Sequence, residues 1–233
     1  MLQSNWLRTL AVTAFITLPA TAMAQTETAP TAPPAPDAAP PAPVVPNKVI
    51  MHTNMGDMTI ELYPEKAPKS VENFLEYVRS GHYNGTIFHR VIDGFMAQGG
   101  GYTADLQLKP MRPAIENEAK NGLSNLRGTL AMARTAEPHS AQAQFFINVV
   151  DNPRLDFVSE QSGYTWGYAV FGKVIDGIDV VDKIRSLETG AQGPMSRDVP
   201  LQTVLIEQVE IVPPVTAAPA EVPVSEPAAA ASN

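Results

Sequence analysis

Eight short runs of alternating apolar and polar residues constrain the fold of this chain more than any other feature. They lie at 49–53, 58–62, 86–92, 95–98, 128–133, 145–150, 169–175 and 203–212. A period of two is typical of a strand with one buried face. Residues 54–57 separate the first two runs, and Asp93-Gly94, a preferred turn dipeptide, separates the next two. Both pairs are therefore predicted to form hairpins.

Two other segments follow a helical spacing. In 68–80 apolar residues recur three and four positions apart, with Pro68 in the first turn and Gly81 as the stop. The spacing recurs more briefly in 178–186, after a predicted N-cap at Asp176. Eight short strands and two helices predict a mainly β fold, a closed eight-stranded antiparallel β-barrel with two α-helices capping its ends.

The N-terminal segment 1–24 is predicted to be a secretory signal peptide. Arg8 precedes a short apolar stretch, and Ala22-Met23-Ala24 provides a small-residue cleavage site. The apolar stretch is shorter than the roughly 20 residues that a membrane span needs. We therefore expect export, with no stable membrane insertion after signal cleavage.

The folded part is predicted to be one domain at 47–212, a length that can bury its own core. The segments on either side, 25–46 and 213–233, are rich in proline and alanine. Such segments bury too little apolar surface to fold, so we expect a disordered linker and a disordered tail. Inside the domain, the connection from 106 to 127 has no clear period and is expected to be functional or ordered by packing.

The composition argues against several classes of function. Cysteine is absent, so an exported form would be stable without disulfides and has no thiol chemistry. The formal net charge of −8 at pH 7 argues against a nucleic-acid partner and against anionic membrane surfaces. The four histidines lack the spacing of a zinc site. Residues 167–174 approach a phosphate-binding loop, but end in valine where magnesium needs a hydroxyl.

A family resemblance rests on four long motifs. They are FHRVIDGFMAQGG at 88–100, GTLAMAR at 128–134, QFFINV at 144–149 and YAVFGKV at 168–174. In this order they are similar to the motifs of the cyclophilins, the peptidyl-prolyl cis-trans isomerases. The resemblance covers nearly all of 47–212 and looks closest to the exported bacterial branch.

The resemblance implies that the chain accelerates cis-trans exchange at X-Pro bonds of polypeptide clients. Rotation about this bond costs amide conjugation, a barrier of about 18–20 kcal/mol, but it breaks no covalent bond. No nucleophile, metal or cofactor is therefore needed. As the amide twists, its nitrogen becomes a hydrogen-bond acceptor, and a fixed donor stabilises that state over both planar ones. By the resemblance Arg90 is this catalytic donor, and Gln98 stands beside it as the second catalytic residue.

Nine further positions are implied to bind the substrate. They are His89, Phe95, Met96, Ala133, Arg134, Gln144, Phe146, Leu155 and Tyr168. The aromatic, leucine and methionine side chains would line a pocket for the proline ring. Gln144 and the backbone of 133–134 would hold the peptide as an added strand. Alternation turns His89 away from Arg90 and Phe145 into the core, so for His89 substrate contact and a structural hydrogen bond both stay open.

Three departures from the family pattern stand near these positions. Arg154 replaces a tryptophan whose indole commonly binds cyclosporin, so weakened cyclosporin binding is expected. Tyr168 stands where many relatives have a histidine, and Gly101 where an aspartate usually follows QGG. The segment 157–166 is longer than in compact relatives and could shape the groove for flanking residues.

These features together predict an exported, periplasmic peptidyl-prolyl isomerase that assists the folding of exported proteins as a monomer. The alternative is a proline-peptide-binding or holdase module with little isomerase activity. The same pocket would serve both. The isomerase and the binding module differ in whether the arginine is needed for turnover or only for binding the peptide.

Overall fold

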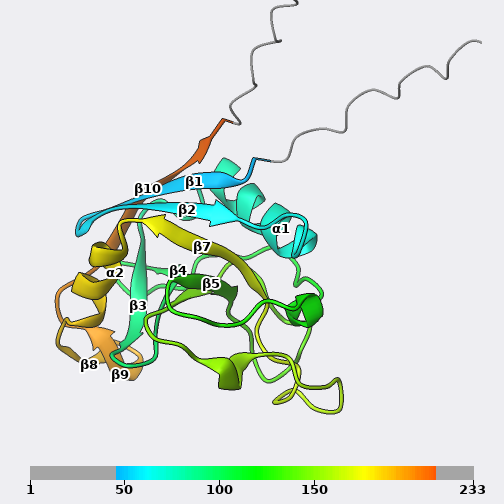
Figure 1. Ribbon diagram of the computed structural model, residues 1–233. Coiled ribbons are helices and arrows are strands. Elements are labelled where there is room, and N and C mark those ends of the chain that lie inside the picture. The colour runs from blue at the N-terminus through cyan, green and yellow to red at the C-terminus, as the bar shows by residue number, and fades with distance from the viewer. Residues whose placement is uncertain (1–45, 214–233) are drawn as a thin grey trace, which may run out of the picture. The chain divides into compact units, whose positions relative to one another are not determined.

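Residues 46–213 are described by the structure, a computed structural model, and their strands close into an antiparallel barrel (Figure 1). The barrel strands are β1 (Lys48–Thr53), β2 (Gly56–Leu62), β3 (Thr86–Ile92), β4 (Met96–Thr103), β5 (Thr129–Met132), β6 (Phe145–Asn148), β7 (Val170–Asp176) and β10 (Leu205–Val212). Their order around the barrel is β1-β10-β3-β4-β6-β5-β7-β2, and β2 pairs with β1. The predicted mainly β, eight-stranded barrel is confirmed.

Both predicted helices are present, at opposite sides of the barrel (Figure 1). In α1 (Pro68–Arg79) the apolar stripe is buried and the proline occupies the first turn, as predicted. In α2 (Ile178–Arg185) the buried residues are Val180, Val181 and Ile184. Side chains of both helices belong to the main core cluster inside the barrel. Each helix thus closes the core with its apolar face.

The predicted N-cap of the second helix at Asp176 is wrong. Asp176 ends β7, and the cap position is taken by Gly177, whose φ is 81° and which offers no side-chain cap. A Cβ at Gly177 would lie 2.2 Å from the carbonyl oxygen of Asp57. The close approach to the β1–β2 hairpin therefore requires glycine, and it overrides the usual preference for a polar cap.

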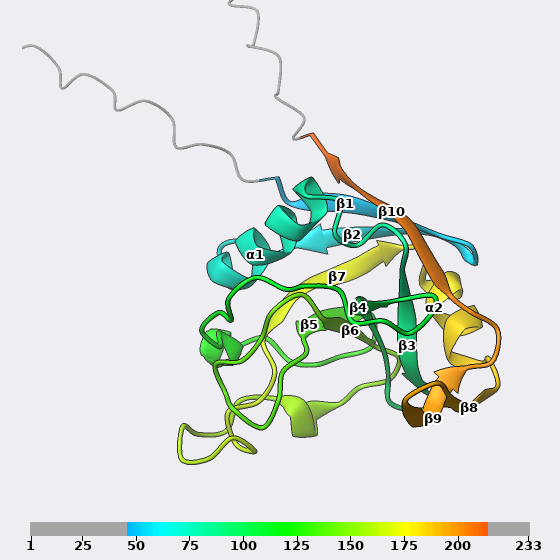
Figure 2. The same ribbon diagram turned by 180° about the vertical axis from the view of Figure 1, so that it is seen from behind.

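A second, smaller sheet was not predicted. It is a hairpin of β8 (Thr189–Gln192) and β9 (Met195–Pro200), which lies beside one end of β3 (Figure 2). Its side chains are mostly exposed or half-buried and do not alternate in polarity. It is anchored by Val199, which packs with Ile87 and Leu106 in a separate apolar cluster.

Buried asparagines order the long connection between β4 and β5. Asn117 donates to the carbonyl of Gly167, and Asn121, at the end of the short 3₁₀ helix η1 (Ala119–Asn121), donates to that of Val170. Asn125 is fully buried, and its side chain donates to Asp156 at 2.9 Å. The expectation that packing orders this connection is confirmed.

The predicted signal peptide and nearly all of the linker and tail fall at 1–45 and 214–233, outside the described residues. Among the described residues, no helix combines the length and the apolar character that crossing a bilayer requires.

Candidate active site

A β-bulge in β3 brings His89 and Arg90 to the same face of the barrel wall. Phe88 pairs with Gly99 and Arg90 with Gln98, so His89 is an extra residue without a partner of its own on β4. Phe88 and Val91 on either side both point into the core. The expectation that alternation turns His89 away from Arg90 is therefore wrong, because the bulge interrupts the alternation.

Arg90 is half-exposed and meets a carboxylate from β9. Its Nε lies 3.5 Å from Oδ2 of Asp198, whose side chain is 22% exposed. Asp198 has a φ of 64°, a left-handed conformation that costs a non-glycine residue about 1–2 kcal/mol. Among the described residues, the two terminal nitrogens of Arg90 make no hydrogen bond, and its one ion pair is through Nε. The outer edge of the guanidinium is therefore open to a ligand.

Gln98 and Gln144 form the polar side of the site. The side chain of Gln98 donates to Oε1 of Gln144 at 2.8 Å, and the carbonyl of Gln144 accepts from the backbone of Ala133 at 2.9 Å. A Cβ at Gly101 would lie 2.6–2.7 Å from three atoms of the Gln144 side chain. Glycine at this position thus leaves the space that Gln144 occupies.

The apolar residues predicted to receive proline form one cluster, separate from the barrel core. Met96, Ala131, Phe146 and Val170 are buried in it, and Phe95, Ala133, Leu155 and Tyr168 pack against it. The rings of Phe146 and Tyr168 meet edge to face, with centroids 5.6 Å apart. Phe145, the neighbour of Phe146, lies in the barrel core as expected. We refer to these eight cluster residues as the apolar floor.

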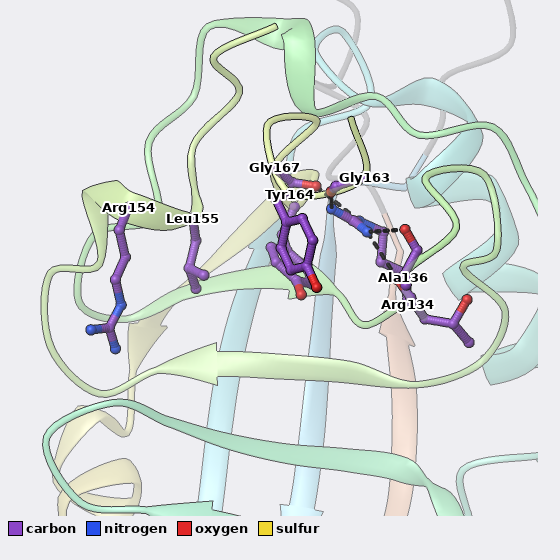
Figure 3. A pocket seen from close by; sticks show the side chains of 9 residues that line it. Arg134, Ala136, Arg154, Leu155, Gly163, Tyr164 and Gly167 are labelled. Carbon is purple, nitrogen blue, oxygen red and sulfur yellow. Dashed lines mark hydrogen bonds between the residues drawn. The ribbon is translucent and has the colours of Figure 1, made fainter. Parts of the chain in front are cut away.

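Arg134 lies at the margin of the apolar floor, and its charge is already engaged. Its guanidinium donates to the carbonyls of Gly167 at 3.0 Å and Gly163 at 2.6 Å (Figure 3). It also lies over the ring of Tyr168, 4.5 Å from the ring centroid. It thus ties the 157–166 segment to the site. Its backbone remains a candidate for peptide contact.

Gly163 and Tyr164 of this segment line part of a pocket of about 410 Å³ next to the apolar floor (Figure 3). Leu155 and Tyr168 line both the pocket and the floor. At one end lies Arg154, whose guanidinium also stacks on Phe95 at 4.8 Å.

His89 is buried next to Arg90, with 4% of its surface exposed. Burial, assisted by the charge of Arg90, lowers the pKa of its imidazole from 6.5 to about 4, so it is neutral at pH 7. Its ring packs on that of Tyr102 at 4.6 Å, and Nδ1 has no hydrogen-bond partner among the described residues. It lines a hollow of about 380 Å³ together with Arg90, Gln98 and Gln144.

Sequence reasoning missed the contribution of the β8–β9 hairpin. Met195, Arg197 and Asp198 line the hollow around Arg90. Nothing local in the sequence signals this, because the hairpin is distant in the chain and reaches the site by packing against β3. Across residues 46–213 no group of three or more His, Asp or Glu side chains is arranged to hold a metal ion.

The family model for "Cyclophilin type peptidyl-prolyl cis-trans isomerase/CLD" matches residues 48–211. The chain is 58% identical over 163 residues to peptidyl-prolyl cis-trans isomerase B of Escherichia coli, which covers 70% of this chain and 98% of that protein. It is 55% identical over 163 residues to a peptidyl-prolyl cis-trans isomerase of Acinetobacter baylyi, covering 70% and 84%. A cyclophilin-type isomerase structure from Cryptosporidium parvum aligns with a TM-score of 0.57 and 28% identity, over 72% of this chain and 98% of that one.

Proposed function

The chain belongs to the cyclophilin-type peptidyl-prolyl cis-trans isomerases and acts on proline-containing polypeptides, and from that membership we propose how its site works. The proline ring binds on the apolar floor, and Arg90 donates to the prolyl nitrogen as the amide twists. The observation that carries this proposal is the register of β3 and β4, which sets Arg90 opposite Gln98 beside the floor.

Arg90 suits the task because its guanidinium stays protonated and its planar fork keeps its direction. In the planar amide the nitrogen lone pair is delocalised, so the donor gains little there. In the twisted amide the lone pair is localised, and the hydrogen bond forms. Only an interaction that is stronger in the transition state raises turnover.

Gln98, Gln144 and the backbone of Ala133 hold the peptide beside this donor. Gln98 both donates and accepts, and its bond to Gln144 fixes the two amides relative to one another. The backbone of residues 133–134, just after β5, is proposed to hold the peptide as an additional extended strand. The apolar floor binds the proline ring in both the cis and the trans isomer, so it does not favour one isomer over the other.

The mechanism is tested by Arg90→Ala, with turnover of a short proline peptide and its Kd measured for the same samples. A charge-assisted hydrogen bond contributes about 1.5–3 kcal/mol, so turnover should fall roughly ten- to a hundredfold while the Kd changes little. Lys48→Ala removes a cation from β1, away from this hollow, and it should stay near wild-type turnover. If Arg90→Ala loses affinity but keeps turnover per bound peptide, the arginine contributes only to peptide binding, as in a binding module.

The setting of the reaction is the second part of the proposal. We propose that residues 1–24 direct the chain across the inner membrane and that it acts as a periplasmic monomer on exported proteins, for which X-Pro exchange can be a slow folding step. Fractionation of the host cells and N-terminal sequencing of the mature chain test this. Recovery of an uncleaved chain in the cytoplasm would contradict it.

Weak cyclosporin binding is proposed for the same site. Arg154 lies against Phe95, where many relatives have an indole that binds the drug, and a guanidinium cannot replace the packing of that ring. Isomerase activity should persist at cyclosporin concentrations that inhibit tryptophan-containing relatives. A nanomolar Kd by calorimetry would contradict this expectation.

A further inference from the structure

Arg154 is the one arginine of the described residues that has neither an ion pair nor a hydrogen bond. Carboxylates pair with Arg79, Arg90, Arg112, Arg127, Arg185 and Arg197. Arg134 is held by backbone carbonyls. Arg154 is exposed and rests only on the ring of Phe95, at 4.8 Å.

The backbone that carries Arg154 is fixed to the apolar floor. Arg154 lies in the 3₁₀ turn η2 (Pro153–Leu155), whose last residue packs against the floor. Asn152, just before the turn, donates to the carbonyl of Phe95 at 2.8 Å and to Oδ1 of Asn148 at 2.8 Å. The anchored backbone and the contact with Phe95 thus place Arg154 beside the proline site.

The contact with Phe95 leaves the N–H donors of the guanidinium without a partner among the described residues. A guanidinium lying over an aromatic face keeps its N–H donors in its own plane, where a carboxylate can accept two of them. Arg134 and Arg154 lie at opposite ends of the pocket in Figure 3, with Leu155 and Tyr164 between them. Only the Arg154 end offers an unengaged charge.

We propose that Arg154 binds the carboxylate of an acidic residue close to the proline, so that the enzyme prefers X-Pro bonds flanked by Asp or Glu. This inference rests on the proposed function, since it requires proline on the apolar floor. Neighbouring Cα atoms are about 3.8 Å apart. A proline ring on Phe95 therefore brings the next one or two residues within reach of a cation on the same ring.

The test compares kcat/KM for capped peptides that differ only in one residue beside the proline, Glu, Gln or Lys, placed after it in one set and before it in another. For the wild-type chain, Glu should exceed Lys by about 1.5- to fivefold in one set, the range expected for exposed charge pairs. The ratio should approach one at 1 M salt, where the Debye length is about 3 Å.

The matched variants are Arg154→Gln, which should abolish the preference, and Arg154→Glu, which should reverse it. Lys48→Glu is the control: it makes the same charge change on β1, away from the pocket, and should leave the ratio unchanged. Circular dichroism checks that each variant is folded.

An Arg154→Glu chain that keeps the wild-type ratio in both peptide sets would overturn the inference. So would equal rates for Glu and Lys peptides in the wild type. Failure of the proposed function looks different. It would appear as unchanged turnover in Arg90→Ala, whatever the peptide preference.

Discussion

At the scale of single residues, one insertion determines the geometry of the site. His89 is the extra residue of the β3 bulge, and because of it two consecutive side chains share one face. Without the bulge, strict alternation would place either His89 or Arg90 in the barrel core. The cost is a buried imidazole whose Nδ1 lacks a partner among the described residues.

This buried imidazole predicts a pH dependence of stability. Folding lowers the pKa of His89 from 6.5 to about 4, so between these values the unfolded chain binds more protons than the folded one. The free energy of unfolding should therefore fall as pH falls through this window, by about 3 kcal/mol at 1.36 kcal/mol per pH unit. Urea unfolding of wild type and His89→Gln at steps from pH 7 to pH 4 measures this loss.

The His89→Gln variant should lack this loss while keeping the contributions of the carboxylates. The difference between the two stability curves then isolates the imidazole. Parallel curves from pH 7 to pH 4 would mean that His89 titrates alike in the folded and unfolded chain.

At the scale of elements, the residue pattern along the chain predicted the strands and helices, but not the bulge or the helix cap. All eight barrel strands and both helices overlap the segments predicted from periodicity. However, β4 continues to Thr103, beyond its predicted end at 98, and β5 and β6 are buried along their whole length. The bulge escaped prediction although the adjacent polar pair His89-Arg90, which lies between the core residues Phe88 and Val91, departs from strict alternation. The cap at Asp176 failed because the packing of Gly177 on Asp57 is a long-range contact.

The candidate site could be predicted only in part for the same reason. The family motifs named Arg90, Gln98 and most of the apolar floor, and the structure brings these residues together. They did not indicate that the guanidinium of Arg134 is held by backbone carbonyls. Nor did they reveal Asp198, because an acidic residue in a polar, exposed hairpin has no distinguishing pattern.

The β8–β9 hairpin makes its own prediction through Asp198. The carboxylate contacts Nε of Arg90 and leaves the terminal nitrogens available. Loss of this carboxylate should therefore leave the Arg90 side chain less well ordered. Asp198→Gly should lower turnover by roughly 1.5- to 5-fold, as expected for a partly exposed ion pair. The melting temperature should stay level or rise, because glycine adopts the φ of 64° without strain.

Asp198→Asn is the matched variant, since asparagine also tolerates this backbone conformation and keeps an acceptor oxygen. Its turnover should lie between wild type and the glycine variant. Wild-type turnover in Asp198→Gly would show that Arg90 needs no partner from the hairpin.

At the scale of the whole molecule, the barrel is sealed by its first and last strands. Lys48 pairs with Val212 and Val49 with Ile211, so the two ends of the domain lie side by side (Figure 2). The pairing of β1 with β10, which we call the seam, closes the barrel wall. Its integrity depends on contacts between residues at the extremes of the domain sequence.

The seam predicts that the domain tolerates circular permutation. A short glycine-serine linker from Val212 to Lys48, with new ends between the exposed residues Glu160 and Gln161, should give a cooperatively folding chain. Its thermal unfolding and far-ultraviolet circular dichroism should resemble those of the parent. A parent chain truncated after Val204 lacks β10 and should not fold. A permutant that fails to fold would show that the order of the strands in the chain matters beyond their pairing.

The seam also has a consequence for how the protein is made. The ribosome synthesises β1 long before β10. Through almost the entire translation of the domain, β1 therefore lacks β10, one of its two neighbouring strands. During that interval β1 and β3 each present an edge with unsatisfied N–H and C=O groups, which invites pairing with other nascent chains. A prolyl isomerase whose own barrel closes last is thus itself exposed to such pairing until its final strand emerges.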